Sequence, residues 1–494
     1  MALETPQKLL KSKMFWVGIL YFAQGFPLGI FYEIFPVYFR QQGVELKDIG
    51  LLSLLGLAWT LKFLWAPAVD HYRHHRLWML TANLLMGLVM IFFAITAGFG
   101  PWVWVAIGCF TLFSATNDIA IDGYTIELLK KNEMGFANGL RIGFYRVGML
   151  ASGVILILSD YLRWSGAYIT AAVMLGLVGL VCLTAPREKD YVREKSLGLG
   201  RELKALFLQP TALGAILLFL LGCVWLINRT TKWSETMPNF WWLAFGVAAV
   251  IMGIGLVIAA RRATPPAETT RITQGPMFGT LMAMLQRPYI IPVIIFILIF
   301  KLADSSMGFM IKPFWVDSGF TATQIGLVSV NIGLVLSIAG GIAGGWFTDR
   351  VGIFKALWIL GLLQAVSNLG YAFVASIIPE AAPGAAILLE HKLLIYGASA
   401  LESFTGGLGT AAFLAFLMAI VNKKHSATEY ALLSSVFALS RSFAGWAGGY
   451  GADMMGYAPY FLLTFFLAFP AYLLLPWVKK MLNYAGSQKD WGQN

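Results

Sequence analysis

Hydrophobic stretches of about 20 residues recur along the chain, and short polar segments separate them. A helix rises about 1.5 Å per residue, so about 20 apolar residues cross the hydrocarbon core of a bilayer. Inside a bilayer no water satisfies the backbone, and a helix satisfies its own polar groups. The pattern therefore predicts an all-α polytopic membrane protein.

The spacing of these stretches predicts fourteen membrane helices in two groups of six, with a pair between them. The expected helices span about 14–40, 48–69, 77–98, 101–128, 135–160, 164–184, 211–228, 240–260, 289–316, 321–348, 354–376, 391–421, 427–452 and 457–478. The expected domains are an N-terminal six-helix bundle at 14–184, a linker with the two additional helices at 185–288, a C-terminal six-helix bundle at 289–478, and a cytoplasmic tail at 479–494.

A weak internal repeat relates the two groups of six. Gly43–Ser53 reads GVELKDIGLLS and Gly319–Ser329 reads GFTATQIGLVS, with Ile-Gly-Leu and the final Ser at one common offset. Arg146 and Arg441 also correspond, since each lies in the fifth helix of its group. Parallel repeats of this kind are typical of transporters whose binding site lies between the halves near the middle of the membrane.

Composition and charge agree with a membrane protein. Only 12% of the residues are charged, whereas soluble proteins carry about 25%. The net charge of +11 does not indicate nucleic acid, because Lys and Arg concentrate in the loops on the side of the N-terminus. Such loops face the cytoplasm, so both termini are predicted to be cytoplasmic. This interpretation places Lys312 in a loop on the outer side of the membrane, opposite the N-terminus.

No cofactor or metal is expected. Cys109, Cys182 and Cys223 lie in apolar stretches without a Cys-x-x-Cys spacing. His71 and His75 are four residues apart but have no third ligand nearby. The chain contains no phosphate-binding loop that ends in Lys-Ser or Lys-Thr, so transport driven by ATP is not expected.

Charged residues inside the predicted helices mark candidate sites, because a charge at that depth costs several kcal/mol unless it is paired or faces water. Asp118 and Asp122 are four residues apart and share one face of the fourth helix. We expect Asp118 to pair with Arg146 of the next helix, either as part of a cavity wall or as a structural pair. In the first helix, Gln24 is a better cavity candidate than Glu33.

The second half carries its own set of charges. Lys301 and Asp304 are three residues apart in the first helix of the second half, at 289–316, and can touch each other. Glu402 has no cation on its own helix, so its partner must come from another one, with Lys301 or Arg441 as candidates. A buried carboxylate whose partner can change is suited to bind and release a proton. Lys62 is expected to reach toward the inner end of its helix instead.

Further charges lie near the cytoplasmic ends of the helices, where they are expected to latch an inner gate. The predicted gating residues are Asp70, Arg73, Arg76, Asp122, Glu127, Arg141, Asp349 and Arg350. Asp122 and Glu127 are expected to pair with Arg141, Arg73 or Arg76 rather than to contact a ligand.

Several motifs resemble a known family. The pattern Gly345-x-x-x-Asp349-Arg350-x-Gly352 resembles the loop motif of the major facilitator superfamily. Segments at 61–70, 115–123 with 145–153, 360–371 and 401–434 resemble AmpG-type muropeptide permeases and their relatives, the acetyl-CoA transporters. That family often has Ser-Gln-Asp where this chain has Thr116-Asn117-Asp118. The side chain of Asn117 is shorter than that of Gln, so its amide reaches less far and the substrate can differ from that of the family.

The resemblance implies a major facilitator fold and a secondary transporter of the bacterial inner membrane that imports muropeptides with protons. The expected substrate-binding residues are Gln24, Asn117, Asp118, Arg146, Lys301, Asp304 and Arg441, and the proton-coupling candidates are Glu402, Asp304 and Asp118. The expected partners are a small-molecule substrate, protons and the lipid bilayer, with no nucleic acid, and the chain is expected to be a monomer.

Alternatives of two kinds stay open. Within the transporter class, another anionic conjugate such as acetyl-CoA or a siderophore is a possible substrate. Outside it, a membrane-embedded transferase would need a His/Asp or Asp/Asp set at one membrane face, whereas the carboxylates here lie mostly deep. A sensor that transports nothing is a third option.

Overall fold

The structure is a computed structural model. It describes residues 12–62, 69, 74–96, 100–129, 134–186, 284, 287–382, 384–421 and 426–490. Contacts between Cα atoms divide the chain into two units, Met1–Lys189 with Pro288–Asn494 and Asp190–Arg287. All helices considered below belong to the first unit. The predicted helices at 211–228 and 240–260 lie outside the described residues, so the linker remains a prediction.

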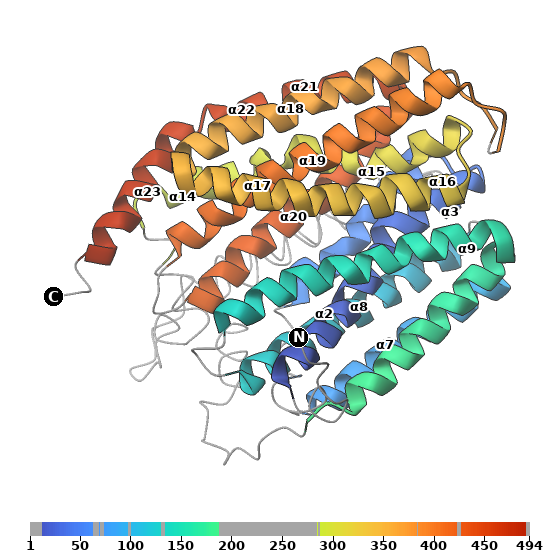
Figure 1. Ribbon diagram of the computed structural model, residues 1–494, viewed down its shortest axis with the longest axis horizontal. Coiled ribbons are helices and arrows are strands. Elements are labelled where there is room, and N and C mark those ends of the chain that lie inside the picture. Colours follow the sequence, from blue (N-terminus) through green and yellow to red (C-terminus); the bar gives the residue numbers. More distant parts are fainter. Residues whose placement is uncertain are drawn as a thin grey trace, which may run out of the picture. The chain divides into compact units, whose positions relative to one another are not determined.

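The N-terminal half, here residues 12–186, contains helices at each of its six predicted positions (Figure 1). Their bounds are α2 Lys13–Gly29, η1 Ile30–Ile34 and α3 Phe35–Gln41; α4 Leu46–Leu52, η2 Ser53–Gly56 and α5 Leu57–Leu61; α7 His75–Ile95; α8 Pro101–Leu128; and α9 Met134–Leu183. Arg163, with φ 59° and ψ 169°, divides α9 into the predicted fifth and sixth helices.

The C-terminal half, here residues 287–490, repeats this arrangement (Figure 1). Its helices are α14 Ile290–Phe300 and α15 Leu302–Asp317; α16 Ala322–Gln324, η7 Ile325–Ile332 and α17 Gly333–Val351; α18 Ile353–Ile377; α19 Leu389–Ile420; α20 Ser426–Met455; and α21 Tyr457–Leu467, α22 Phe469–Tyr472 and α23 Leu475–Asp490. The chain bends by 47° between α22 and α23.

Length and apolar composition of these helices match a bilayer. In the part of the chain that the structure describes, eight helices are long and apolar enough to cross a membrane, or nine if the bent pair counts as one span. Large apolar side chains also point away from the protein, among them Ile95, which is 78% exposed, and Ile342, which is 72% exposed. Lipid accounts for such a surface, and the predicted all-α polytopic fold is confirmed.

Two helices contain wide π-helical turns. The segment η1 lies between Pro27 and Pro36, which lack the N–H group that a regular helix needs. The segment η7 follows the short helix α16, whose N-terminus is capped by Thr321. Wide turns change the direction in which side chains point and are frequent at functional sites.

The two halves meet tightly at one end of the bundle, which is called the closed end below. Arg40, near the end of α3, places Nε 2.6 Å from Oδ1 of Asp317, the last residue of α15. The hydroxyl of Tyr457 donates to the same carboxylate at 2.5 Å. The backbone N–H of Thr323 donates to Asp160 at 2.6 Å. These contacts connect α3 and α9 of the N-terminal half to α15 and α16 of the C-terminal half, and they connect α15 to α21.

Glycines let backbones of the two halves touch near the closed end. A Cβ atom added to Gly449 of α20 would lie 2.4 Å from the carbonyl oxygen of Leu46 and 2.6 Å from Cα of Gly50. A Cβ on Gly445 would lie 2.6 Å from the side chain of Ser53. The α4–α20 contact therefore has no room for a methyl group.

Gly449→Ala is expected to prevent closure of this end while leaving each half folded, because the added methyl group collides only with the opposite half. The measurement is disulfide cross-linking of Lys47→Cys to Asp453→Cys in a background without Cys109, Cys182 and Cys223; Lys47 Nζ lies 4.0 Å from Asp453 Oδ2. The control is Gly341→Ala, whose Cβ would have no atom within 4 Å. Equal cross-linking in both variants would contradict this account.

Candidate functional site

A balanced charge cluster lies inside the N-terminal half. The Nζ atom of Lys62 lies 3.6 Å from Oδ2 of Asp118 and 3.8 Å from Oδ2 of Asp122. The predicted pairing of Asp118 with Arg146 is therefore wrong in this conformation. The expectation that Lys62 reaches toward the end of its helix is wrong as well, because the i,i+4 carboxylates of α8 both attract it inward.

Asp122 has two further partners. It accepts a hydrogen bond from the hydroxyl of Tyr21 at 2.7 Å and forms an ion pair with Arg141 at 3.2 Å. The guanidinium of Arg141 also lies 4.6 Å from the ring centre of Tyr21. The predicted pairing of Asp122 with Arg141 is confirmed. Together with Lys62 and Asp118, these groups form a neutral set of two cations and two carboxylates.

The buried amide side chains of Asn117 and Gln24 differ in how many of their hydrogen-bonding atoms already have a partner. Asn117 is fully buried; it donates to the carbonyl of Ala23 at 3.2 Å and accepts from Asn83 at 3.1 Å. In this conformation its amide therefore joins the first, third and fourth helices. Gln24 is buried too, but its Oε1 atom has no hydrogen-bond partner among the described residues, and the same holds for Oδ1 of Asp118. These two oxygen atoms are open to a further donor.

Arg146 and Arg441 have no carboxylate within ion-pair distance in the part of the chain that the structure describes. The guanidinium of Arg441 lies 4.4 Å from the ring centre of Tyr32. Tyr145 lies within electrostatic range of both arginines, and the two guanidiniums repel each other. One arginine from each half thus contributes to a common positive site that has no ion-paired carboxylate among the described residues.

An aromatic group borders this positive site. Tyr32 stacks at 6.3 Å on Trp59 and packs edge-on at 5.8 Å against Phe309 of the C-terminal half. Phe31 packs edge-on against Trp59 at 5.1 Å. Ring faces of this kind can pack against the apolar faces of sugars.

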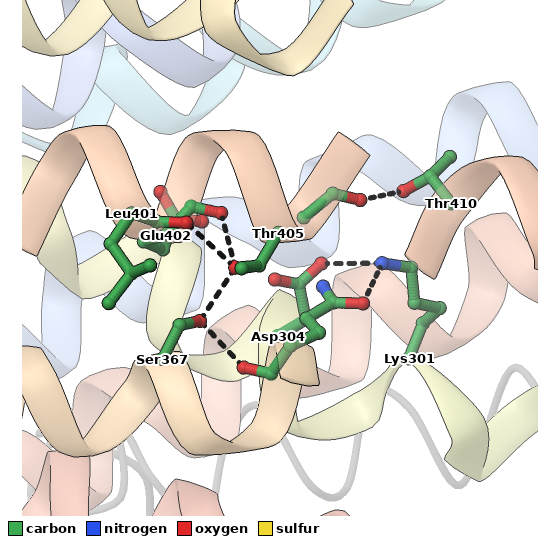
Figure 2. A network of polar contacts seen from close by, with 9 residues as sticks. Lys301, Asp304, Ser367, Leu401, Glu402, Thr405 and Thr410 are labelled. Carbon is green, nitrogen blue, oxygen red and sulfur yellow. Dashed lines mark hydrogen bonds and ion pairs between the residues drawn. The ribbon is translucent and has the colours of Figure 1, made fainter. Parts of the chain in front are cut away.

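The C-terminal half contains a polar network, shown in Figure 2. Lys301, between α14 and α15, is buried; its Nζ donates to Asp304 at 3.1 Å and to Oε1 of Gln364 at 2.8 Å. The predicted contact of Lys301 with Asp304 is confirmed. Ser367 of α18 donates to the carbonyl of Gln364 at 2.6 Å and accepts from Thr405 at 2.9 Å. The network connects α15, α18 and α19.

Glu402 lies at the edge of this network (Figure 2). Its Oε2 atom accepts a hydrogen bond from Ser403 at 3.3 Å, and no cation lies within ion-pair distance among the described residues. A Cβ added to Gly406 would lie 3.7 Å from Glu402, 3.8 Å from Gln364 and 4.0 Å from Asp304. The two carboxylates therefore approach one point. Asp304 and Gln364 also line a small cavity of about 10 Å³ between α14, α15, α18 and α22.

Comparison with known proteins agrees with this architecture. Residues 17–240 match the family model described as Major Facilitator Superfamily. The chain is 27% identical over 479 residues to "Anhydromuropeptide permease" of Escherichia coli (strain K12), which covers 94% of this chain and 79% of that protein. It is 24% identical over 493 residues to "Putative transporter AmpG 4" of Rickettsia felis (strain ATCC VR-1525 / URRWXCal2), covering 96% and 99%.

The chain is similar to AmpG-type permeases, and its fold is that of the major facilitator superfamily. Among solved structures, the fold is similar to that of a POT family transporter in complex with 5-aminolevulinic acid, with a TM-score of 0.62, 12% identity, and coverage of 94% of this chain and 96% of that one. The protein is thus a secondary transporter and not an enzyme.

The predicted gating residues of the permease are only partly described. Asp70, Arg73 and the side chain of Glu127 lie outside the described residues. Arg76 donates to the carbonyls of Leu183 and Ala185 at 3.3 and 3.0 Å and thereby connects the third helix to the sixth.

Asp349 and Arg350 are exposed at the end of α17, and the Arg350 guanidinium lies 4.2 Å from the ring centre of Trp346. Gly352, with φ 86°, separates α17 from α18; a side chain would be strained there. The roles of all these residues in gating remain predictions.

Sequence reasoning missed one pair in the permease. Lys312 was counted with the outside loops, but it lies within α15, where its side chain is 11% exposed and its Nζ is 3.0 Å from Oε2 of Glu33. The signal was present, because position 312 falls inside the predicted helix 289–316. A charge at that position requires a partner.

Lys62→Met is expected to lower the free energy of unfolding by about 2 kcal/mol, less than the roughly 3–5 kcal/mol of a fully buried pair, because Lys62 is 28% exposed. The loss leaves two carboxylates with only Arg141. Unfolding in detergent, followed by tryptophan fluorescence, measures it.

The double variant Lys62→Met/Asp118→Asn should recover most of this loss, because it removes the uncompensated charge. The control is Lys355→Met, at an exposed position, which should change stability little. Additive losses in the double variant would show that the Lys62–Asp118 pair is not the cause.

Proposed function

We propose that this permease imports muropeptides, the disaccharide-peptide fragments of the cell wall, across the bacterial inner membrane together with protons. The observation that carries the proposal is the pair of uncompensated arginines, Arg146 and Arg441, one from each half. The names of the relatives support the substrate class.

An anion explains why two arginines are kept without carboxylates. An uncompensated guanidinium is costly within a membrane, and a bound carboxylate offsets that cost through charge-assisted, often bidentate hydrogen bonds. Because Arg146 and Arg441 belong to different halves, one anion can bring the halves together. The carboxylates of a muropeptide peptide suit this position.

The aromatic group beside the arginines supports a substrate that also contains sugars. Tyr32, Trp59 and Phe309 present ring surfaces from both halves next to Arg441. In this proposal the peptide carboxylates face the arginines, while sugar rings pack on the aromatic faces. Gln24 and Asp118, with their open oxygen atoms, accept hydrogen bonds from substrate hydroxyl or amine groups.

Orientation and coupling complete the proposal. The closed end faces the periplasm and both termini face the cytoplasm, as the distribution of Lys and Arg indicates. Glu402 carries the proton, because it lies close to Asp304 and has no cation within ion-pair distance in the described ranges. Asp304 pairs with Lys301 and Asp118 pairs with Lys62, so these two carboxylates are the less suited carriers in this proposal.

Purified protein in proteoliposomes should accumulate a labelled anhydro-disaccharide-tripeptide under an inward proton gradient. Acetyl-CoA and a ferric siderophore serve as competitors. Arg146→Gln and Arg441→Gln should each lower kcat/KM by about 100-fold, the effect of removing one group from a charged hydrogen-bonded pair.

The control for the arginine variants is Lys355→Gln, at an exposed position. Uptake of acetyl-CoA with no uptake of the disaccharide-peptide would replace the proposed substrate. Unchanged kcat/KM in both arginine variants would remove the arginines from the binding site.

Glu402→Gln should abolish accumulation driven by the proton gradient but preserve exchange of substrate at equal pH, because a glutamine keeps the shape and cannot release a proton. Glu390→Gln, in the exposed first turn of the same helix α19, is the matched control and should accumulate normally. Normal accumulation in Glu402→Gln would rule out Glu402 as the proton carrier and direct attention to Asp304.

A further inference from the structure

Three polar atoms from three helices converge over Gly406 of α19. A Cβ atom added to this glycine would lie 3.7 Å from Oε1 of Glu402 in α19, 3.8 Å from Nε2 of Gln364 in α18 and 4.0 Å from Oδ1 of Asp304 in α15. Apart from the chain around the glycine itself, no other atom lies as near to that point. The glycine therefore leaves room for one further atom, and polar groups surround that room.

The orientation of the Gln364 amide follows from its hydrogen bond to a lysine. Oε1 of Gln364 accepts from Nζ of Lys301 at 2.8 Å, and an ammonium group can only donate. The other end of the amide, Nε2, is the end near Gly406. This nitrogen is buried and has no hydrogen-bond partner among the described residues. A buried donor without an acceptor is costly, so Nε2 needs an acceptor at this place.

Each of the two carboxylates also has one oxygen atom left over. Glu402 uses Oε2 to accept from Ser403 at 3.3 Å, and Asp304 uses Oδ2 to accept from Lys301 at 3.1 Å. The oxygen atoms near Gly406 are the other two, and they have no hydrogen bond or ion pair in the part of the chain that the structure describes. The site thus presents one donor and two acceptors.

Side chains of the surrounding helices do not fill this room. The titratable groups that face Glu402 are Asp304, Lys301 and Lys312 at α15 and Tyr371 of α18. The ammonium group of Lys301 already donates to Asp304 and Gln364. Lys312 lies 3.0 Å from Glu33 and donates to Ser329 at 2.9 Å. The group that satisfies the three free atoms therefore comes from outside the chain.

One donor and two acceptors together select a water molecule. Water can donate to both carboxylate oxygens while it accepts from the Gln364 amide, and buried waters typically make about three hydrogen bonds. A metal cation or an ammonium group cannot accept from the amide, and two carboxylates repel an anion. Water near the Cβ position is close to hydrogen-bond distance from all three atoms, and small rotations of Glu402 and Asp304 complete the contacts.

We propose that the space over Gly406 binds one water molecule, which accepts from Gln364 and donates to Glu402 and Asp304, and that Glu402 exchanges its proton through this water. The second part of the proposal deepens the proposed proton coupling and rests on it. Gly406 leaves the space for the water and Gln364 orients it, so both act as positioning residues for Glu402.

The exchange balances atoms and charge. When Glu402 releases its proton, the O–H bond at Oε1 breaks and the proton binds to the oxygen atom of the bound water. That water passes one proton to a neighbouring water on the open side of the protein and is a neutral water again. Uptake is the reverse reaction. Glu402 binds a proton while the protein is open to the periplasm and releases it while the protein is open to the cytoplasm, so a proton moves inward.

The first test looks for the water itself and needs no substrate. Crystals of the full chain in a lipid mesophase, at a resolution that shows ordered water, should give a density peak about 2.6–3.2 Å from Glu402 Oε1, Asp304 Oδ1 and Gln364 Nε2. A map that shows other buried waters but none within hydrogen-bond distance of at least two of these atoms would overturn the proposal.

Gly406→Ala should expel the water and keep the fold. Its methyl group takes the point where the three polar atoms converge, and the nearest of them is 3.7 Å away, so no collision results. Alanine is also more favourable than glycine within a helix. Gly406→Ser places a hydroxyl group beside the same point, which can donate to a carboxylate and accept from the Gln364 amide. Its map should show this hydroxyl group in place of the water.

Transport should separate the two variants. In proteoliposomes, Gly406→Ala should lower the initial rate of uptake driven by the proton gradient by about 100-fold, the contribution typical of a positioned proton-transfer group, and preserve exchange at equal pH. Gly406→Ser should recover most of this rate. Because serine is larger than alanine, its rescue shows that a hydrogen-bonding group was missing. Equal losses in both variants would contradict the role of the water in proton exchange.

The matched control is Gly397→Ala on the same helix, whose Cβ would have no atom within 4 Å. It should transport at the rate of the unmodified protein. An uptake rate of Gly406→Ala equal to that of Gly397→Ala would also contradict the proposed exchange. If muropeptides are not transported at all, the density test still decides whether the water is bound, so its result is independent of the proposed function.

Discussion

The free-energy cost of an uncompensated charge in a medium of low polarity determines how the charged side chains pair in the interior of this permease. It explains why Lys62 lies between Asp118 and Asp122 and why Lys301 bonds both Asp304 and Gln364. The groups that depart from this pattern are informative. Among the described residues, Arg146 and Arg441 have no carboxylate within ion-pair distance, and Glu402 has no cation within that distance.

The two halves use charge differently. In the N-terminal half, two cations and two carboxylates compensate each other's charge within a single cluster. In the C-terminal half, Lys301 pairs with Asp304 and Lys312 pairs with Glu33 of the opposite half, which leaves Glu402 without an ion-pair partner among the described residues. A neutral cluster in one half beside an incompletely paired set of charges in the other suits a transporter that alternates between two conformations.

Much of the fold followed from the sequence because apolar length is a strong, local signal. The helix predicted at 101–128 has those bounds in the structure, and the break at Arg163 falls between the helices predicted at 135–160 and 164–184. Contacts within one turn, such as Lys301 with Asp304, were equally accessible, since three residues place two side chains on the same face.

Pairings between helices were much harder to predict. Spacing along a helix does not say which neighbour faces which side, so Asp118 was assigned to Arg146 rather than to Lys62. Lys312 was misplaced because its position near a predicted helix end suggested a loop, whereas α15 continues to Asp317. The π-helical turns that orient Glu33 and Ser329 leave no simple pattern in the sequence.

The glycine contact between α4 and α20 has a consequence for the energy of motion. Where Gly50 meets Gly449, backbone touches backbone, and neither residue has a side chain to bury. Hydrophobic stabilisation grows with the apolar area removed from water, at about 25 cal/mol per Å². Separating the two backbones at this point therefore uncovers little apolar area. The hydrophobic contribution to closure comes instead from neighbouring side chains of both halves, such as Ile49 and Phe309, which belong to one buried cluster.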